Sequence, residues 1–335
     1  MNVNIKTIAQ KAGVSTATVS RVLNDYKGIR EVTRKKVLKV INEYDYEINA
    51  IAKSLKQERT MTIGIVLGNI LSQFYSIVAK SVEDTASKYG FSTILCNGDD
   101  DPAKELKYLK ILKSNRVDGI ILTPTGKNAT YVNKLIKNGT KIVLLDRMIE
   151  NVSCDAVLVD NLNGSFQAIN HLIGQGYKRI GIVNGYIDRT TGHDRLEGYK
   201  KALQESNIKI DENLIKIGNF KKDSGYSLTE ELLKSKPDAI FVTNLDMVLG
   251  SVLLLKEKGI KIPYEIGFIG FDDSEWALLL DPALTVVQQP VYQLGETAAE
   301  ILIKKINSNE ETKNILVHVL NTHLIIRQSS VKNNN

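Results

Sequence analysis

The sequence predicts a small all-α helix-turn-helix domain followed by an α/β core of two doubly wound parallel-sheet subdomains. Three observations support this fold class. Two short amphipathic helical patterns flank Gly13-Val14-Ser15, the first 60 residues carry all the net charge, and short apolar runs alternate with helical stretches from Met61 onward. With 335 residues, 43% of them hydrophobic, the chain can bury a sizeable core.

The helix-turn-helix pattern runs from Ile5 to Asn24 and places its apolar residues on one face of each helix. Gly13 can take the positive φ of a tight turn, and Ser15 can accept a hydrogen bond from an unpaired N–H of the next helix. That helix presents groups that suit the major groove of DNA: Thr16, Ala17, Thr18, Ser20 and Arg21. An ordinary surface helical hairpin fits the spacing as well.

The charge distribution favours DNA binding. Residues 1–60 hold 12 Lys and Arg against 6 Asp and Glu, whereas the whole chain holds 44 against 38, so the remainder is balanced at 32 of each. A protein that neutralises phosphates and releases counterions needs such a basic surface. A solvated charge run would explain the count but not its coincidence with the helix-turn-helix.

Other classes of protein find little support. Cys96 and Cys154 stand far apart without a CxxC motif, so we expect neither a disulfide nor a zinc site. We expect both to be core residues of a protein in a reducing compartment. The start of the chain has no apolar signal-peptide core, and no run of about 18 apolar residues occurs, so we expect a soluble, cytoplasmic protein. Nucleotide-binding, hydrolase-elbow and zinc-protease motifs are missing, which predicts neither an enzyme nor a cofactor.

A third helix, with Val37, Ile41 and Tyr44 on one face, should close a small core over the first two. The next segment, 46–55, contains a short helical pattern that Asn49 can cap. So short a helix is not stable alone, so we expect a second subunit or DNA to order it. Ala52 is small enough for two such helices to approach, and Leu55 is a candidate wedge for the minor groove. The alternative is a linker that packs on the next domain.

The α/β region predicts repeated βαβ units with a break near Asp160 to Asn163, which suggests two halves. We expect the late segments Thr285 to Gln289 and Leu316 to Ile326 to return and complete the first half. Expected strands are 62–67, 91–96, 118–122, 141–145, 156–159, 179–183, 239–243 and 267–270. Expected helices include 76–89, 104–114, 163–175, 195–206 and 247–258.

Polar and aromatic residues follow several of these strands. Open α/β sheets bind ligands beyond the carboxyl ends of their strands, and carboxylates and amides beside aromatic faces suit a carbohydrate. Singly, an Asp or Asn there more often caps a helix or makes a turn. The residues that follow the strands include Phe74, Tyr75, Asp146, Arg147, Asn244, Asp246, Asp272, Trp276 and Gln289.

Over essentially its whole length, the chain resembles the LacI/GalR family of transcriptional regulators. The matching segments are TIAQKAGVSTATVSRVLN, NAIAKSL, RVDGIIL, LLDR, RLEGYKKAL, GFDD and LTVVQQP. The resemblance implies a homodimer on a pseudo-palindromic operator, hinge helices in the minor groove, and a periplasmic-binding-protein-like core that closes on a small effector. It also favours repression, with the effector changing the angle between the two halves and thereby the spacing of the hinges.

The resemblance also implies residue roles. Thr16, Ala17 and Arg21 would read bases, Ser15, Thr18 and Ser20 would position the domain, and Leu55 would be the wedge. The full DNA-binding set adds Thr7, Asn24 and Ala52. The effector contacts carried over by position are Phe74, Tyr75, Asp146, Arg147, Arg195, Phe220, Asn244, Asp272 and Gln289, to which we add Asp246 and Trp276.

The expected domains are a helix-turn-helix domain at 1–48, a hinge and linker at 49–60, a first effector-binding subdomain at 61–160 with 290–330, and a second at 161–289. The chain departs from the family at three places. Ile48 stands where the hinge usually has Pro, Asn244-Leu245-Asp246 replaces a common Asn-Asp pair, and Arg30 replaces a Ser cap.

The effector expected is a small carbohydrate or sugar acid, that is, a sugar or sugar derivative. Phe74, Tyr75 and Phe220 keep a purine or nucleoside as the alternative, because stacked aromatics favour a base. A solute-binding protein would share the core, but it should carry a signal peptide and lack the basic domain.

Overall fold

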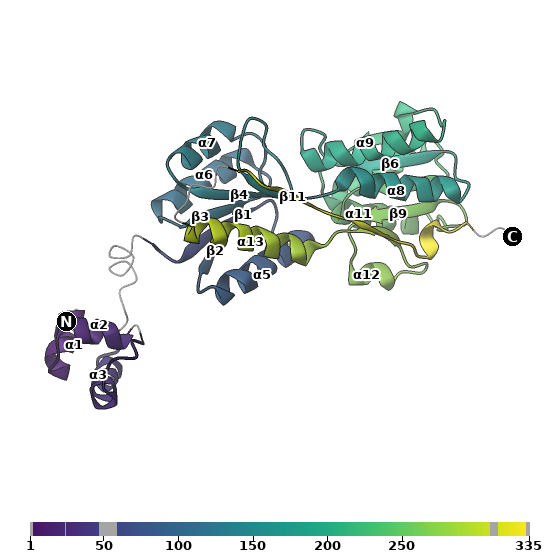
Figure 1. The fold of residues 1–335 in the computed structure, drawn as a ribbon. Coiled ribbons are helices and arrows are strands. Elements are labelled where there is room, and N and C mark those ends of the chain that lie inside the picture. The colour runs from purple at the N-terminus through teal and green to yellow at the C-terminus, as the bar shows by residue number, and fades with distance from the viewer. Residues whose placement is uncertain (1–2, 24, 47–58, 309–313, 333–335) are drawn as a thin grey trace. The chain divides into compact units, whose positions relative to one another are not determined.

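The protein is described by a computed structural model that covers residues 3–23, 25–46, 59–308 and 314–332. The chain divides into two compact units, Met1–Thr60 and Met61–Asn335. The first is helical, and the second has two α/β lobes (Figure 1). This confirms the predicted fold class of a helix-turn-helix domain and two parallel-sheet subdomains. Within the described ranges, no helix is long and apolar enough to cross a membrane.

The described part of the helical unit contains three helices: α1 (Ile5–Ala12), α2 (Thr16–Leu23) and α3 (Glu31–Glu43). Their inward faces bury Ile8, Ala9, Ala12, Val19, Val22, Val37 and Val40. The predicted turn chemistry is confirmed. Gly13 ends α1 with a left-handed φ of 59°, and Ser15 Oγ accepts a hydrogen bond of 3.1 Å from the Thr18 N–H.

Helix α3 begins without a side-chain cap, because Arg30 at its N-cap position makes no capping hydrogen bond. Arg30→Ser should therefore stabilise the helical unit by about 1 kcal/mol by satisfying an unpaired N–H. Hydrogen exchange of the α3 amides in the full chain should slow by about fivefold. Arg30→Ala is the matched control, since it removes the same charge without adding an acceptor; equal protection in the two variants would contradict the capping account.

The first lobe is built on a parallel sheet of order β11-β5-β4-β3-β1-β2. Its strands are β1 (Thr62–Leu67), β2 (Ser92–Asn97), β3 (Gly119–Leu122), β4 (Lys141–Leu145), β5 (Asp155–Val159) and β11 (Val317–Leu320). Its helices are α5 (Gln73–Lys88), α6 (Pro102–Ser114), α7 (Ala129–Lys137) and α13 (Val291–Asn307). Helices α5 and α13 pack on one face, and α6 and α7 on the other.

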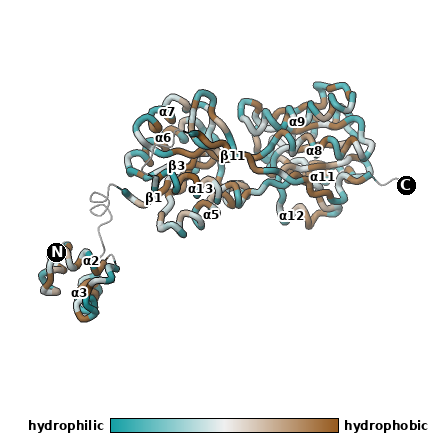
Figure 2. The backbone as a smooth tube through the Cα atoms, viewed as in Figure 1, coloured by the Kyte–Doolittle hydropathy of each residue, from teal (hydrophilic) through white to brown (hydrophobic). Residues whose placement is uncertain are grey.

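The second lobe has the sheet order β12-β10-β9-β8-β6-β7, with only β12 antiparallel to its neighbour. Its strands are β6 (Ile180–Asn184), β7 (Ile215–Ile217), β8 (Ala239–Val242), β9 (Gly267–Phe271), β10 (Thr285–Gln288) and β12 (His323–Ile325). Its helices are α8 (Asn161–Gly174), α9 (Thr190–Glu205), α10 (Lys222–Leu233), α11 (Leu245–Glu257) and α12 (Glu275–Leu278), with 3-10 turns η1 (Glu212–Leu214) and η2 (Gln328–Ser330). Helices α8 and α9 cover one face, α10 and α11 the other, and Figure 2 shows hydrophobic stretches running through both lobes.

The strand pairing corrects the expectation for the late segments. We expected both to complete the first half, but β10 pairs with β9 and β12 pairs with β10 in the second sheet, leaving only β11 to the first. The expected assignment of 290–330 to the first subdomain is thus wrong for β12 and η2. We expected 316–326 to act as one segment, yet it divides between two sheets on either side of Asn321-Thr322, because pairing depends on partners remote in the chain.

Candidate functional site

Helix α2 presents the predicted DNA-reading residues on its surface. Thr16, Ala17 and Arg21 are exposed, and the Arg21 guanidinium lies 5.6 Å from the centroid of the Tyr26 ring. Ser15 is exposed, and its hydroxyl makes two contacts with Thr18. It accepts a hydrogen bond from the Thr18 N–H, and it lies 2.9 Å from the Thr18 hydroxyl. Ser20 is partly buried on the same helix.

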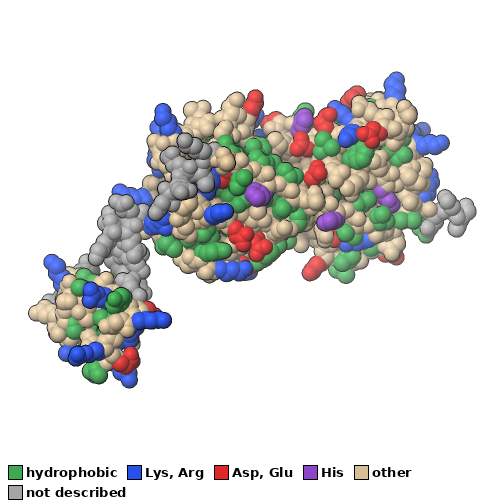
Figure 3. Space-filling model, in the orientation of Figure 1, with side chains coloured by type: hydrophobic (Ala, Val, Ile, Leu, Met, Phe, Trp, Pro, Cys, Tyr) green, Lys and Arg blue, Asp and Glu red, His purple; other side chains and the backbone are tan. Residues whose placement is uncertain are grey.

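The Thr7 hydroxyl donates to Asn4 Oδ1 at 3.3 Å beside the N-cap of α1. Lys and Arg side chains stand out over the surface of the unit in Figure 3. The predicted residues Asn24, Ala52 and Leu55, and the hinge that contains the last two, lie outside the described residues. The DNA contacts of the whole set stay a prediction.

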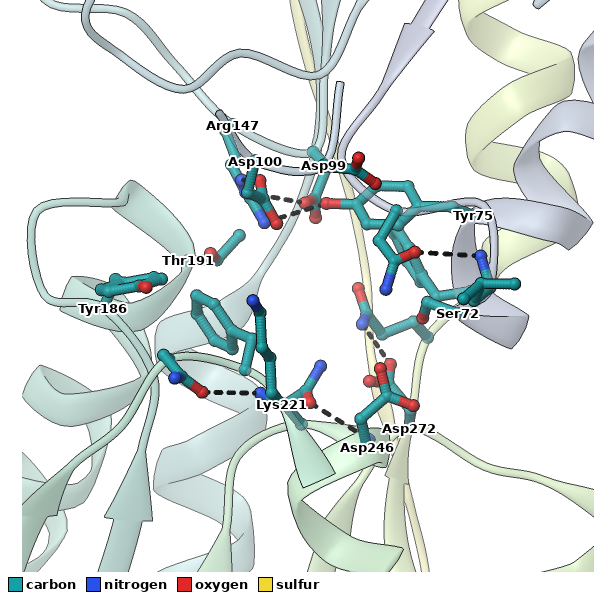
Figure 4. A pocket seen from close by; sticks show the side chains of 18 of the residues that line it. Ser72, Tyr75, Asp99, Asp100, Arg147, Tyr186, Thr191, Lys221, Asp246 and Asp272 are labelled. Carbon is teal, nitrogen blue, oxygen red and sulfur yellow. Dashed lines mark hydrogen bonds and ion pairs between the residues drawn. The ribbon is translucent and has the colours of Figure 1, made fainter. Parts of the chain in front are cut away.

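A cavity of about 400 Å³ lies between the two lobes of the α/β unit, beyond the carboxyl ends of strands from both sheets (Figure 4). It lies where the sequence placed an effector site. The predicted residues that line it are Phe74, Tyr75, Asp146, Arg147, Arg195, Phe220, Asn244, Asp246, Asp272 and Gln289. Trp276 does not line it, because its ring packs against the apolar cluster of the second lobe that contains Ala277 and Leu284.

Arg147 anchors the wall formed by the first lobe. It follows β4 directly, and its Nη1 donates to Asp100 Oδ1 at 2.5 Å while its Nη2 donates to the Tyr75 hydroxyl at 2.9 Å. Burial opposes its charge, yet Tyr75, Asp100 and Asp146 hold the pKa of Arg147 above its ordinary value. Burial also raises the pKa of Tyr75 and of Asp146. The guanidinium therefore stays charged and fixes the acceptors around it.

Arg195 plays the matching part in the second lobe. It comes from α9, is 4% exposed, and lies 3.7 Å over the Phe271 ring. Its Nε donates to Asn161 Oδ1 at 2.8 Å and its Nη1 to the Thr243 carbonyl at 2.6 Å. Burial lowers the pKa of Arg195, and the charge of Asp272 opposes this decrease.

Asp272, Gln289 and Asn244 form the floor beside Arg195. The Gln289 amide nitrogen donates to Asp272 Oδ1. Burial raises the pKa of Asp272, although Arg195 and this hydrogen bond oppose the rise. Asn244 caps α11, because its Oδ1 accepts from the N–H groups of Asp246 and Met247 at 3.1 and 3.2 Å. Protein hydrogen bonds thus hold these three side chains in the floor of the cavity.

Several lining residues have left-handed backbone, which side-chain-bearing residues rarely adopt. Asp99 and Asp100 have φ of 53°, Asp146 68°, Phe220 61° and Asp272 77°. Such strain is typical of ligand-binding sites, where it costs about 1–3 kcal/mol per residue and is held by the surrounding structure. These turns after the strands aim the side chains at the cavity.

The cavity is also lined by residues that the predicted set of effector contacts did not contain. Asp99 and Asp100 follow β2, so the carboxyl-end rule applied to that strand would have found them. Asn219 and Lys221 follow β7, which the sequence did not predict. The lining residues outside the predicted set are Asn69, Leu71, Ser72, Asp99, Asp100, Tyr186, Thr191, Asn219 and Lys221.

The chemistry of the lining suits binding rather than catalysis. Five carboxylates face three cations, and two aromatic pairs, Phe74 with Tyr75 and Tyr186 with Phe220, meet edge to face at centroid distances of 5.0 and 5.8 Å. In the described part of the chain, no group of three or more His, Cys, Asp or Glu side chains is arranged to hold a metal ion.

A basic helix-turn-helix unit and a two-lobed α/β unit with a ligand-sized cavity together define a DNA-binding regulator that responds to a small effector. A family model for "Bacterial regulatory proteins, lacI family" matches residues 4–49, and one for "Periplasmic binding proteins and sugar binding domain of LacI family" matches residues 60–325. The chain therefore belongs to the LacI family of transcriptional regulators, as its resemblance implied.

Individual relatives agree with this assignment. The chain is 36% identical to the HTH-type transcriptional regulator RegA of Clostridium saccharobutylicum, covering 99% of this chain and 100% of RegA. It is 30% identical to a transcriptional regulator CelR solved in complex with cellobiose, with a TM-score of 0.75 and coverage of 98% and 100%. A lac repressor dimer bound to operator, 24% identical, has the same fold with a TM-score of 0.87 over 99% and 100% of the two chains. RegA and CelR are named as transcriptional regulators, not as enzymes. A transcriptional regulator acts on DNA, which agrees with the expected cytoplasmic location.

Proposed function

We propose that the protein is a repressor that binds a pseudo-palindromic operator as a homodimer, and that a carbohydrate or sugar derivative in the cavity controls its operator affinity. The observation that carries the sugar assignment is the cavity lining. Asp146, Asp272 and Gln289 are each at least 94% buried and face the cavity as hydrogen-bond acceptors. Buried acceptors require donors, and a sugar supplies several hydroxyl donors on one small ring.

Aromatic side chains complete the fit for a sugar. Phe74 and Phe220 come from different lobes and offer apolar surface to the C–H face of a ring. Cellobiose in the related CelR structure supports the same chemistry. The two rings come from elements that can move relative to each other, so a sugar between them would favour one arrangement of the lobes.

A purine or nucleoside is the second candidate, because four aromatic rings line the cavity. Tyr75 is poorly placed to stack on a base, because its hydroxyl is bound to Arg147 and its ring stands at 82° to that of Phe74. The many carboxylates also favour a sugar, which has several hydroxyl donors, over a purine base, which has few donors.

Thermal unfolding of the full chain with a ligand panel tests the assignment. The panel should contain neutral mono- and disaccharides, their amino and acid derivatives, and purine bases and nucleosides. A sugar present at a hundred times its Kd should stabilise the α/β unit by about 2.7 kcal/mol and raise its Tm. A shift with purines alone, or with no member of the panel, would contradict the sugar assignment.

The contacts between the lobes suggest how the effector acts. Ser274 Oγ donates to Gln73 Oε1 at 2.7 Å, and Lys127 pairs with Asp188 at 2.9 Å, each pair joining one lobe to the other. An effector that touches both lobes shifts the balance among such contacts and so the angle between the lobes. We propose that the hinge and the dimer partner sense this angle.

Gly185 offers a test of Phe220 as a contact. A Cβ at Gly185 would lie 1.8 Å from Phe220 Cε1, so Gly185→Ala must displace the ring. We expect about a fivefold loss of sugar affinity, the equivalent of an aromatic contact of about 1 kcal/mol. Isothermal titration measures it. Gly174→Ala, where the added Cβ meets nothing within 4 Å, is the control; equal affinities in the two variants would argue against Phe220.

A further inference from the structure

We infer that Asp246, with Asp272 and the carbonyl oxygen of Gln289, forms an acceptor-only corner of the cavity that binds a hydroxyl or ammonium group of the sugar and excludes the corresponding sugar acid. Asp246 is then a specificity-determining residue. This inference rests on the proposed function, because it concerns which class of sugar the same cavity takes. Figure 4 shows Asp246 and Asp272 on the same side of the cavity.

Asp246 has an unusual position for a carboxylate. It is half-buried in the first turn of α11, and among the described residues no Lys or Arg forms an ion pair with it. Burial first, and then the nearby Asp272 charge, raise the pKa of Asp246. The positive end of the helix dipole favours a carboxylate at this place. In the described structure, Asp246 therefore lies in the wall of the cavity without a cationic partner.

Gln289 provides an independent sign that a ligand group belongs here. Its amide nitrogen faces Asp272, because an ionised carboxylate only accepts hydrogen bonds. The amide oxygen must then point elsewhere, and Oε1 is buried without a hydrogen-bond partner in the described structure, on a side chain that is 6% exposed. A buried acceptor left in this way is destabilising. A hydroxyl or ammonium group of a ligand would satisfy it.

Among the described residues, Arg195 opposes the rise in the pKa of Asp272, but no cation of the cavity forms an ion pair with Asp246. Arg147 donates to Asp100 and Tyr75, and Arg195 donates to Asn161 and the Thr243 carbonyl. Lys221 is exposed. A carboxylate or phosphate placed beside Asp246 and Asp272 would meet two like charges at low dielectric, which is unfavourable.

Sugar selectivity in the Asp246→Asn variant tests the inference. The probes are three matched sets based on glucose, galactose and mannose, each with the neutral sugar, the 2-amino-2-deoxy sugar and the uronic acid, measured by isothermal titration with the full chain. We expect the wild type to bind a neutral or amino sugar at least about tenfold more tightly than the matched uronic acid. In Asp246→Asn that preference should shrink by about tenfold, because the side-chain shape is kept while a charge is removed.

Asp223→Asn is the matched control, since Asp223 occupies the same first-turn position of α10, is exposed and does not line the cavity. It should leave the preference unchanged. Tighter binding of a uronic acid by the wild type, or an unchanged preference in Asp246→Asn, would overturn the inference while leaving the sugar assignment standing. Failure of every sugar to bind would instead overturn the proposed function, and this inference with it.

Discussion

Replacing Arg147 with alanine is expected to lower the free energy of unfolding of the α/β unit by about 3–5 kcal/mol, because it leaves buried charges without their partner. Asp146 is 5% exposed, and its Oδ1 already has no hydrogen-bond partner in the described structure. Loss of Arg147 would also free Asp100 and the Tyr75 hydroxyl. Urea denaturation of the full chain followed by circular dichroism measures the loss.

The same variant has a pH dependence of known sign. Burial raises the pKa of Asp146, so the folded state holds its proton more tightly than the unfolded state. Stability that depends on this proton is present at low pH and lost as pH rises through the raised pKa. The Arg147→Ala defect should therefore be smaller at pH 5 than at pH 8.

Two control variants accompany Arg147→Ala. Adding Asp146→Asn to Arg147→Ala should restore part of the stability, because the unpaired charge is gone. Arg179→Ala removes an arginine whose side chain is half exposed and pairs with Asp211 at 3.5 Å, and it should cost about 1 kcal/mol or less. A loss from Arg147→Ala no larger than that from Arg179→Ala would contradict the role given to the buried cluster.

Replacing Asp272 with asparagine is expected to weaken sugar binding by about tenfold to a hundredfold, because it removes a charged acceptor worth about 1.5–3 kcal/mol. The same change should stabilise the empty protein at neutral pH. Burial raises the pKa of Asp272, so its ionised form is less favourable in the folded state than in the unfolded state. Asparagine keeps the shape and avoids that cost.

The pH profile of the empty protein separates this account from simple loss of a contact. The raised pKa of Asp272 makes its stability contribution fall as pH rises, and Asp272→Asn should abolish that fall. The gain in Tm over the wild type should thus be larger at pH 8 than at pH 5. A variant that is less stable than the wild type at pH 8 and binds sugar equally well would contradict both parts.

Local signals in the sequence predicted much of the molecule. The turn at Gly13 and the cap at Ser15 depend on residues next to each other in the chain, and the structure confirms both. Asp146 and Arg147 were found for a similar reason, since they follow a strongly apolar strand directly. Arg195 and Phe220 lie within less informative stretches, and only the family resemblance pointed to them.

Features that depend on remote contacts were beyond local reasoning. Trp276 lies in α12, a few residues past the end of β9, where the chain has already turned its side chain into the apolar cluster of the second lobe. The short edge strand β7 carries only three residues, so its pattern is too brief to predict, and Lys221 beyond it was missed. The left-handed backbone at Phe220 is likewise imposed by the fold, because nothing about phenylalanine favours it.

The coupling between sugar and operator is the central claim, and operator titration tests it most directly. A duplex selected from random DNA by the full chain would be labelled and titrated with wild type and with Asp272→Asn, with and without the sugar identified by thermal unfolding. We predict that saturating sugar changes the operator affinity of the wild type by at least about fivefold. At the same sugar concentration Asp272→Asn should respond less than the wild type, because it binds the sugar more weakly, although its operator affinity without sugar is that of the wild type. An operator affinity that is the same with and without a bound sugar would contradict the account.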